Sequence, residues 1–323
     1  MIFLSGGVAL LVALGGTLVL LPRLRAAGMV GRDMNKPGQP EIPEMGGLAL
    51  VAGFGAGVLL TVALEAFSPD LLGVEFTALL ATLCTVLLTT LIGVADDLIG
   101  MRQLVKAFLP VVAALPLVAV RAGHETMMIP FLGEVDFGML YPLVLVPLGV
   151  TGAANAVNML AGFNGLELAA GVVAMGSLAV IAAGLGEATA LAILLAGIGA
   201  SVGLLLFNWY PARAFVGDVG TLAIGAVIAT AVIVGNFEAA GLIMIAPYGL
   251  DFLLKAAHGF PSKGWWGELG ADGKLRCPAH GPVSLPQLVM KLTGGVREPT
   301  LVYLLVGIEA LCGLAAAVLY LRP

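Results

Sequence analysis

The sequence predicts an all-α polytopic membrane protein, and three observations lead to that fold class. The chain of 323 residues is 60% hydrophobic and only 11% charged, with a mean hydropathy of +1.06, whereas soluble domains carry roughly 25% charged residues. The apolar residues gather in long runs, and a membrane-spanning helix needs roughly 20 of them. Lys and Arg residues fall almost entirely on alternate connections between these runs. We therefore expect a single transmembrane domain over residues 1–323.

Ten apolar runs are long enough to cross a bilayer as helices. They cover residues 1–21, 46–67, 73–95, 104–120, 138–158, 166–184, 188–207, 219–235, 240–256 and 300–320. The strands of a membrane β-barrel would be half as long and would alternate in polarity, and the sequence shows no such pattern. The frequent Gly and Ala residues suit close contact between helices in lipid. The sequence therefore predicts about ten transmembrane helices.

Two connections contain residues typical of small β-hairpins. The fourth, residues 121–137, includes TMMIPFLGEVDFG, with a turn expected near Leu132–Glu134. The ninth and longest, residues 257–299, includes WWGELGADGKLRCP, with Asp272-Gly273 placed to form its turn. We expect both hairpins to be minor additions to a helical bundle.

The distribution of basic residues predicts the orientation of the chain. Of the 15 Lys and Arg residues, all but Arg121 and Arg322 belong to odd-numbered loops or to the helix ends beside them. Positively charged residues stay on the cytoplasmic side of a membrane. We therefore expect a multi-pass protein of the cell membrane with both termini outside and with the odd-numbered loops, including residues 257–299, in the cytoplasm.

The unusual polar residues also gather on the odd-numbered loops. They are Asp33, Asn35 and Lys36 in the first loop, Asp96, Asp97 and Lys106 beside the third, Asn155, Asn158, Asn164 and Glu167 beside the fifth, Asn208, Arg213 and Asp218 in the seventh, and His280 in the ninth. Polar residues with independent structural roles would have no reason to choose one side. Their common location predicts a single active site on the cytoplasmic face.

The adjacent carboxylates Asp96 and Asp97 have two interpretations. They end an apolar run, where a charged group is costly unless it is solvated or has a function. Neighbouring residues of a helix point about 100° apart, so the two side chains cannot serve one ligand equally. One interpretation makes one of them a base or ligand while the other holds Lys106 or a helix end. The other makes both of them solvated residues at a helix end.

The remaining motifs have structural alternatives as well. Asn155 and Asn158 are three residues apart and share one helix face, which suits hydrogen bonds between helices as well as a ligand. Asp218 directly precedes a helix, where an aspartate is a common N-cap. Phe215 could stack on a base or anchor the chain at the interface, and His280 could be a solvated loop residue.

Taken together, these residue types indicate a site for a phosphate–metal complex. Carboxylate and amide oxygens are ligands that Mg²⁺ prefers, and lysines bind phosphate oxygens as point charges. Phosphoryl transfer depends mainly on positioning and charge neutralisation. A site at a membrane face implies that the second reactant is a lipid.

Five stretches of the chain, in order, resemble the polyprenyl-phosphate N-acetylhexosamine-1-phosphate transferases. They are DMNKPGQPEIPEMGG (33–47), GVADDLIGMRQLVK (93–106), NAVNMLAGFNGLE (155–167), FNWYPARAFVGDVG (207–220) and SLPQLVMKLTGGVREP (284–299). NMLAGFNGLE and NWYP are most similar to the branch that contains the UDP-GlcNAc–dolichyl-phosphate GlcNAc-phosphotransferase of N-glycosylation, whereas GDVGTLAIGA is more similar to bacterial members. The resemblance implies ten transmembrane helices, a cytosolic active site and a homodimer.

The resemblance also implies the reaction and the residues that carry it. A polyprenyl phosphate, dolichyl or undecaprenyl, would attack the β-phosphate of UDP-GlcNAc to give polyprenyl-diphosphate-GlcNAc and UMP, with Mg²⁺, or Mn²⁺ in its place, as cofactor. By motif, the resemblance gives Asp218 and Asn158 as metal ligands, Lys106 on the pyrophosphate, Asp96 and Asp97 beside the lipid phosphate, Phe215 stacked on uracil, Asn164 at the uracil edge, and Lys36 and Glu167 among the other substrate-binding residues.

One stretch departs from the family pattern. The GlcNAc branch usually carries a basic PRHR-like run in the ninth loop, where arginines and a histidine meet the sugar and the pyrophosphate. We match this run to CPAHGPVS, in which His280 aligns but Ala279 and Gly281 stand where arginines would be. Arg276 is placed to compensate. Arg276 and His280 are therefore the predicted contacts of the sugar-phosphate.

Other functions fit the sequence less well. The same reaction with UDP-MurNAc-pentapeptide or UDP-GalNAc is an alternative within this chemistry. An ion-coupled secondary transporter is an alternative of another class, but its charged residues would lie near the bilayer midplane, where only Glu309 falls. An intramembrane aspartyl protease would need a GxGD motif, which Asp218 lacks. Nothing in the composition indicates nucleic-acid binding.

Overall fold

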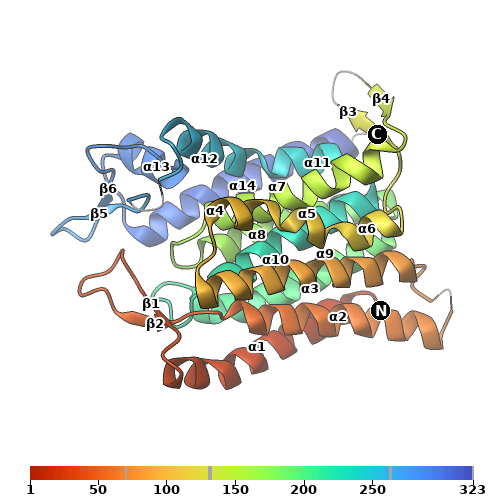
Figure 1. The fold of residues 1–323 in the computed structure, drawn as a ribbon, viewed down its shortest axis with the longest axis horizontal. Coiled ribbons are helices and arrows are strands. Elements are labelled where there is room, and N and C mark those ends of the chain that lie inside the picture. The colour runs from red at the N-terminus through yellow and green to blue at the C-terminus, as the bar shows by residue number, and fades with distance from the viewer. Residues whose placement is uncertain (70, 130–132, 262–263, 322–323) are drawn as a thin grey trace.

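The long helices of the protein run side by side in one bundle (Figure 1). The computed structural model describes residues 1–69, 71–129, 133–261 and 264–321. In this part of the chain, eight helical segments are long and apolar enough to cross a membrane. They are α1 (Phe3–Ala26), α2 (Gly47–Phe67), α3 (Phe76–Ile99), the π-helical turn η1 (Tyr141–Leu145) continued by α7 (Val146–Met159), α8 (Leu166–Leu185), α9 (Ala188–Asn208), α10 (Gly217–Gly235) and α14 (Glu298–Leu321). The predicted all-α polytopic fold is confirmed.

The other two predicted spans are interrupted helices. One consists of α11 (Glu238–Met244) and α12 (Ala246–Ala257), which are bent by 54°. The other is divided into α4 (Gln103–Phe108), α5 (Pro110–Ala113) and α6 (Leu115–Ala119). A proline follows each of these breaks, at Pro247, Pro110 and Pro116, and a proline has no N–H to continue the helical hydrogen bonds. Hydropathy located both segments, but the breaks follow from the prolines.

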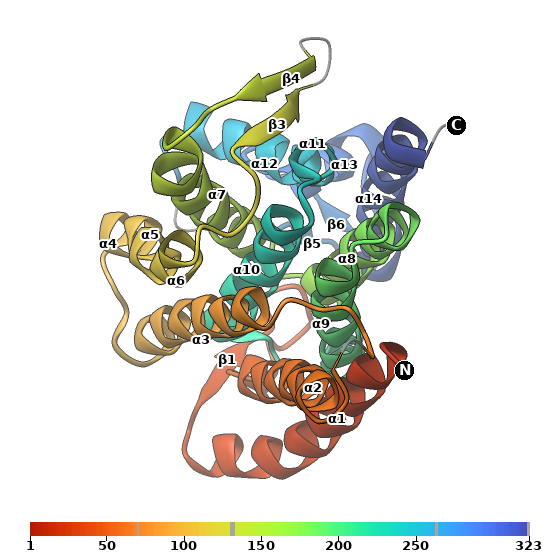
Figure 2. The same ribbon diagram turned by 90° about the vertical axis from the view of Figure 1, so that its right-hand side faces the viewer.

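Helix α10 lies at the centre of the bundle (Figure 2). From Val219 onward every residue of α10 is buried. Small residues let its neighbours approach closely: a Cβ atom added at Gly225 would lie 2.4 Å from the Ala153 carbonyl oxygen of α7, and one added at Gly93 of α3 would lie 2.5 Å from the Val219 Cα. This packing holds the N-terminus of α10 against α3 and α7.

Three small antiparallel hairpins connect the helices. They are β1 (Val30–Arg32) with β2 (Glu41–Pro43), β3 (Thr126–Ile129) with β4 (Gly133–Asp136), and β5 (Glu268–Leu269) with β6 (Leu275–Arg276). The hairpins in the fourth and ninth loops are as predicted, and Gly273, with φ +74°, lies in the turn of the ninth. In the fourth loop Glu134 already belongs to β4, and residues 130–132 lie outside the described part. The first hairpin was not predicted, since its strands have only three residues each.

The two ends of the bundle differ in what they carry. Hairpins β1–β2 and β5–β6 and the helix α13 (Leu285–Thr293) lie at one end, whereas both chain termini and β3–β4 lie at the other (Figure 1). This arrangement places the odd-numbered loops together, as the charge pattern predicts. Lys263 and Arg322, which entered that pattern, lie outside the described residues. Which end faces the cytoplasm stays a prediction.

Candidate active site

A cavity of about 1510 Å³ lies among the helices, and one end of its lining is formed by the first loop, with Arg32 and Asn35, and by the ninth loop, with Trp265 and Trp266. Its polar wall contains predicted site residues from several elements: Asp96, Lys106, Asn158, Asn164, Glu167, Phe215 and Asp218. These residues come from α3, α4, α7, α8, α10 and the loops between them. The structure therefore brings together most of the side chains that the sequence placed in one site.

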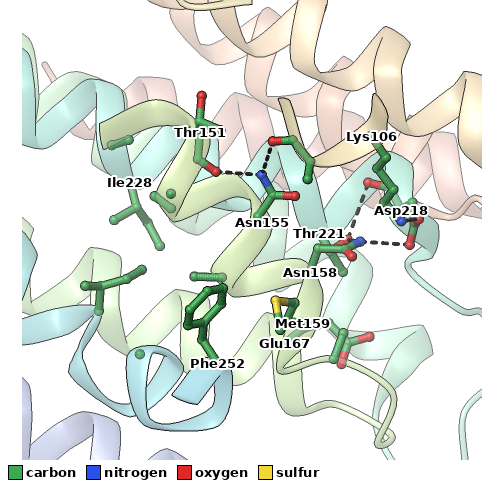
Figure 3. Close-up of a pocket in the computed structure, with 18 of the residues that line it drawn as sticks. Lys106, Thr151, Asn155, Asn158, Met159, Glu167, Asp218, Thr221, Ile228 and Phe252 are labelled. Carbon is green, nitrogen blue, oxygen red and sulfur yellow. Dashed lines mark hydrogen bonds and ion pairs between the residues drawn. The ribbon is translucent and has the colours of Figure 1, made fainter. Parts of the chain in front are cut away.

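Lys106 joins two carboxylates at the centre of this wall (Figure 3). Its ammonium group lies 2.7 Å from Asp96 Oδ2 and also contacts Asp218 Oδ2. Helix α3 ends at Ile99, and Gly100 after it has a φ of +63°, so the chain can turn there and continue into α4. Lys106 thus links α3, α4 and α10.

Asp97 has a different partner from its neighbour. Its carboxylate accepts hydrogen bonds from the backbone N–H groups of Asp218, at 3.0 Å, and of Val219, at 3.2 Å. These N–H groups begin α10 and have no partner within that helix. Asp97 therefore caps α10 from the adjacent helix α3, while Asp96 holds Lys106. Each aspartate thus performs one of the two structural tasks, holding Lys106 or a helix end, that the sequence offered for one of them, and a role as base or ligand stays a prediction.

The two asparagines of α7 also have separate roles. Asn158 Nδ2 donates to Asp218 Oδ1 and to Thr221 Oγ1, both at 2.8 Å. Asn155 Nδ2 donates to the Ala107 and Thr151 carbonyl oxygens at 2.9 Å, so it ties α7 to α4. Asn158 belongs to the carboxylate cluster, and Asn155 makes the hydrogen bond between helices that was its alternative interpretation.

The donor set of this cluster fits a hard divalent cation. Asp218 and the amide of Asn158 present oxygen ligands at the cavity wall, and Mg²⁺ is usually bound by one or two carboxylates together with water and substrate phosphates. The described residues hold no group of three or more His, Cys, Asp and Glu side chains placed to bind a metal. Asp96 and Asp218 contact one ammonium group and Asp97 lies near it, so a divalent cation would balance the excess negative charge of the three carboxylates.

Glu44 adds a further carboxyl group to the cavity wall. Burial raises the pKa of Glu44 above its usual value, and the nearby negative charge of Asp218 raises this pKa further. The smaller of these two causes means that the carboxylates of Glu44 and Asp218 repel each other when both are ionised. Glu44 is not among the predicted site residues, because it stands among the prolines of the first loop.

Lys36 and Asn164 belong to a second network, which ties the first loop to the rest of the protein. Lys36 Nζ lies 3.1 Å from Asp33 Oδ2 and contacts Glu298 Oε2. Asn164 donates from its backbone N–H to Glu298 Oε1 at 2.8 Å and from Nδ2 to Asp33 Oδ2 at 3.1 Å, and its Oδ1 accepts from Ala212 N at 2.9 Å. We call Asp33, Lys36, Asn164 and Glu298 the loop-1 network. Lys36 lies outside the main cavity lining, and both predicted binding side chains are already engaged within the protein.

Phe215 and Glu167 lie where substrate could reach them. Phe215 lines the cavity between α9 and α10, and its backbone N–H donates to the Pro43 carbonyl oxygen at 2.8 Å. Glu167, in the first turn of α8, also lines the cavity, and its Oε2 has no hydrogen-bond partner among the described residues. Their binding roles stay predictions.

The two residues predicted from the ninth loop lie elsewhere. Arg276 is exposed on β6 and makes two hydrogen bonds with Asp272, at 2.9 and 2.6 Å. His280 is exposed, with its Nε2 3.3 Å from the Gly264 carbonyl oxygen. Neither lines the main cavity. Instead, the ninth loop contributes Trp265 and Trp266, and the end of α12 contributes Lys255. In the sequence, this tryptophan pair indicated only a hairpin, although it also marks the cavity wall.

Away from the polar cluster the cavity continues as an apolar groove. Its lining follows α7 past Thr151 and follows α10 to Ile228 and Ile233, with Phe252 of α12 on the facing side (Figure 3). Helix α10 has 19 residues and is therefore roughly 28 Å long, about the thickness of the bilayer hydrocarbon. The groove thus joins a charged site at one membrane face to the membrane interior.

A family model and several known proteins are similar to this chain, and their names agree with one another. A family model described as glycosyl transferase family 4 matches residues 79–236, a span that includes Asp96, Lys106, Asn158 and Asp218. A protein of Sulfolobus acidocaldarius is 36% identical over 98% of this chain and 95% of its own length, and one of Saccharolobus solfataricus is 35% identical over 94% and 92%. Both carry the provisional name UDP-N-acetylglucosamine–dolichyl-phosphate N-acetylglucosaminephosphotransferase. A Dictyostelium discoideum protein of the same name is 29% identical over 88% of this chain and 80% of its own length.

Proposed function

The chain belongs to glycosyl transferase family 4, and we propose that it transfers N-acetylglucosamine-1-phosphate from UDP-GlcNAc to a polyprenyl phosphate. The products are polyprenyl-diphosphate-GlcNAc and UMP. The observation that carries this proposal is the position of the Asp96–Lys106–Asp218 cluster at the mouth of an apolar groove. A lipid phosphate can place its isoprenoid chain in such a groove and its headgroup at the cluster.

The transfer forms one P–O bond and breaks another. An oxygen of the lipid phosphate attacks the β-phosphorus of UDP-GlcNAc, and the bond from that phosphorus to the bridging oxygen breaks, so the bridging oxygen leaves with UMP. A phosphate monoester is already largely ionised at pH 7 because its second pKa is near 6. The attack therefore needs alignment and charge neutralisation more than a general base.

Each member of the cluster has a task in this scheme. Lys106 stabilises the negative charge that develops on the phosphate oxygens, and Asp96 holds its ammonium group in position. Asp97 caps α10 and so fixes the backbone that carries Asp218. Asp218 and Asn158 would hold Mg²⁺, which when bound supplies further positive charge to the phosphate oxygens. Stacking of uracil on Phe215 is compatible with its place in the cavity.

The proposal includes an orientation. The Lys and Arg residues of the odd-numbered loops support a cytoplasmic active site, with both termini outside. UDP-sugars are charged and do not cross a bilayer, which agrees with a site on the side where they are made. The homodimer that the family resemblance implies stays a prediction.

The purified protein, given UDP-GlcNAc, Mg²⁺ and a polyprenyl phosphate, should release UMP, and EDTA should stop the release. Asp218→Asn should lower the rate at least about 100-fold, since it removes a charge from the proposed metal site, while the melting temperature stays near the wild-type value. Failure of a panel of UDP-sugars, including UDP-GalNAc and UDP-MurNAc-pentapeptide, to yield UMP would exclude the proposed reaction.

A further inference from the structure

A second lysine lies on the opposite side of the α7 terminus from Lys106. The ammonium group of Lys255, near the end of α12, donates to the Met159 carbonyl oxygen, and the preceding residue, Asn158, donates to Asp218. Both lysines line the cavity. The last residues of α7 therefore stand between two cations, and the partial negative charge of a helix C-terminus favours cations there.

Asp251 fixes Lys255 in this position. Asp251 is fully buried; its Oδ2 lies 2.7 Å from Lys255 Nζ, and its Oδ1 accepts from the N–H of Leu285, the first residue of α13, at 2.7 Å. The Met159 oxygen accepts from one donor of the ammonium group, and Asp251 Oδ2 forms an ion pair with it that lacks hydrogen-bond geometry, so at least one of the three donors is left for a ligand. Replacing a buried ion pair by apolar residues is often neutral for stability, so stability alone does not account for a lysine that reaches the cavity.

Trp265 completes this part of the wall. Lys255 Nζ lies 5.8 Å from the centre of its ring, within the range of a cation–π contact. The Trp265 ring packs edge-on against Phe163, with centroids 6.3 Å apart, and against Trp266, at 5.5 Å. A Cβ atom at Gly162 would lie 2.1 Å from Trp265 Cη2, so the ring also lies directly on the backbone. The indole is thus a rigid apolar surface beside a cation.

The positions of the neighbouring residues indicate which end of the UDP-sugar would lie against Lys255 and Trp265. Phe215, the proposed uracil contact, is hydrogen-bonded through its backbone to Pro43 and Gly46 on the first-loop side of the cavity. Lys255 and Trp265 belong to α12 and the ninth loop. A diphosphate that begins at Phe215 and passes Lys106 would extend its sugar towards them. The cations predicted for this role, Arg276 and His280, lie outside the cavity.

We propose that Lys255 and Trp265 form the subsite for the sugar-phosphate end of the UDP-sugar. The free donor of the Lys255 ammonium group binds an oxygen of the β-phosphate or of the attached hexosamine, and the Trp265 ring bounds the apolar face of the sugar. This inference rests on the proposed function, because it takes a UDP-N-acetylhexosamine as the ligand. In this chain, the ammonium group of Lys255 and the indole of Trp265 would take the place of the arginines that the ninth loop lacks.

The test compares Lys255→Gln with Lys291→Gln, which changes an exposed lysine of α13 outside the cavity. UMP release is measured while UDP-GlcNAc is varied at fixed polyprenyl phosphate. Lys255→Gln should raise the KM for UDP-GlcNAc about tenfold or more, whereas inhibition by UMP and the KM for the lipid stay within about twofold. Lys291→Gln should match the wild type. An unchanged KM for UDP-GlcNAc, or an equal loss of UMP inhibition, would overturn the proposal.

Two further measurements test the proposal even if Lys255→Gln does not fold. The double variant Asp251→Asn with Lys255→Gln leaves no unpaired buried charge, and it should show the same selective rise in KM. In the wild-type protein, UDP-GlcNAc should protect Lys255 from acetylation, measured by mass spectrometry, whereas UMP should not. Equal acetylation with and without UDP-GlcNAc contradicts the subsite. If the wild type releases no UMP, the proposed function fails; if it does and Lys255→Gln behaves identically, only this inference fails.

Discussion

Two lysines of this protein each bind two carboxylates, yet the two clusters differ in what they expose. Lys106 pairs with Asp96 and Asp218, whose side chains are 13% and 27% exposed, whereas Lys36 pairs with Asp33 and Glu298, at 4% and 3%. The carboxylates of the first, open cluster are partly exposed in the cavity wall, whereas those of the second, closed cluster are almost fully buried in the loop-1 network. The same ion-pair chemistry can therefore bind substrate in one place and hold a loop in the other.

The largest effect is expected at the open cluster. Lys106→Met should lower the rate of UMP release about 100-fold or more, because it removes the ammonium group that faces the phosphate oxygens. The melting temperature should fall only slightly, since Asp218 is partly exposed to the cavity. Activity is measured in detergent or nanodiscs, and melting is followed by tryptophan fluorescence. A variant that melts well below the wild type and keeps its rate would reverse the comparison.

The closed cluster should respond in the opposite sense. Lys36→Met leaves Asp33 and Glu298 buried without their cation, and removal of one partner of a buried pair costs about 3–5 kcal/mol. We expect a marked fall in melting temperature and, in the fraction that stays folded, a smaller loss of activity than in Lys106→Met. Equal melting temperatures for Lys36→Met and the wild type would show that the loop-1 network is not structural.

Asp97 tests whether a residue that only positions Asp218 affects the rate. Asp97→Ala removes the cap of α10, which should lower the free energy of unfolding by about 1–2 kcal/mol. It should also lower the rate, since Asp218 follows directly from that helix terminus. The matched control is Asp136→Ala at the exposed hairpin β3–β4, where the aspartate accepts from Gly138 N and caps no helix. An Asp97→Ala variant as stable as Asp136→Ala would remove the capping role.

The smallest expected effect concerns the groove. Gly152 of α7 lines it, and a Cβ atom added there meets nothing within 4 Å. Gly152→Leu should fit the fold but project into the groove, and so raise the KM for polyprenyl phosphate several-fold without changing that for UDP-GlcNAc. Gly176→Leu on α8, also without neighbours at its Cβ, is the control outside the groove. An unchanged lipid KM would place the isoprenoid elsewhere.

The sequence predicted the helices well because hydropathy and proline act locally. Eight of the ten runs are helices long enough to span a membrane and a ninth is the bent pair α11–α12, whereas residues 103–119 are shorter. These helices, the Asp272-Gly273 turn and the common side of the polar residues needed no tertiary information. The roles of the residues within the site, in contrast, could be assigned only from the tertiary structure. Asp97 accepts from the N–H of Asp218, which is 121 residues further along the chain, and a local pattern cannot show that. Arg276 and His280 were expected at the sugar from a motif match, but the hairpin β5–β6 turns Arg276 outward to Asp272.

Lys255 is the opposite case, because it lines the cavity but was not a predicted site residue. It stands at the end of an apolar run, four residues after Asp251, and such a pair usually indicates an exposed ion pair on a helix. Only the break before α12 and the packing of α13 bury Asp251 and bring Lys255 to the cavity. Buried partners supplied by distant segments decide which of the charged residues belong to the site.

The central claim, transfer of sugar with its phosphate, is tested most directly by following the β-phosphorus. UDP-GlcNAc labelled with ³²P at the β-position is incubated with the purified protein, Mg²⁺ and polyprenyl phosphate, and the lipid and water-soluble products are separated. The account predicts that the label moves into the lipid fraction while unlabelled UMP appears in equal amount. Label that remains in water-soluble UDP, with sugar in the lipid, would mean hexose transfer without phosphate and would contradict it.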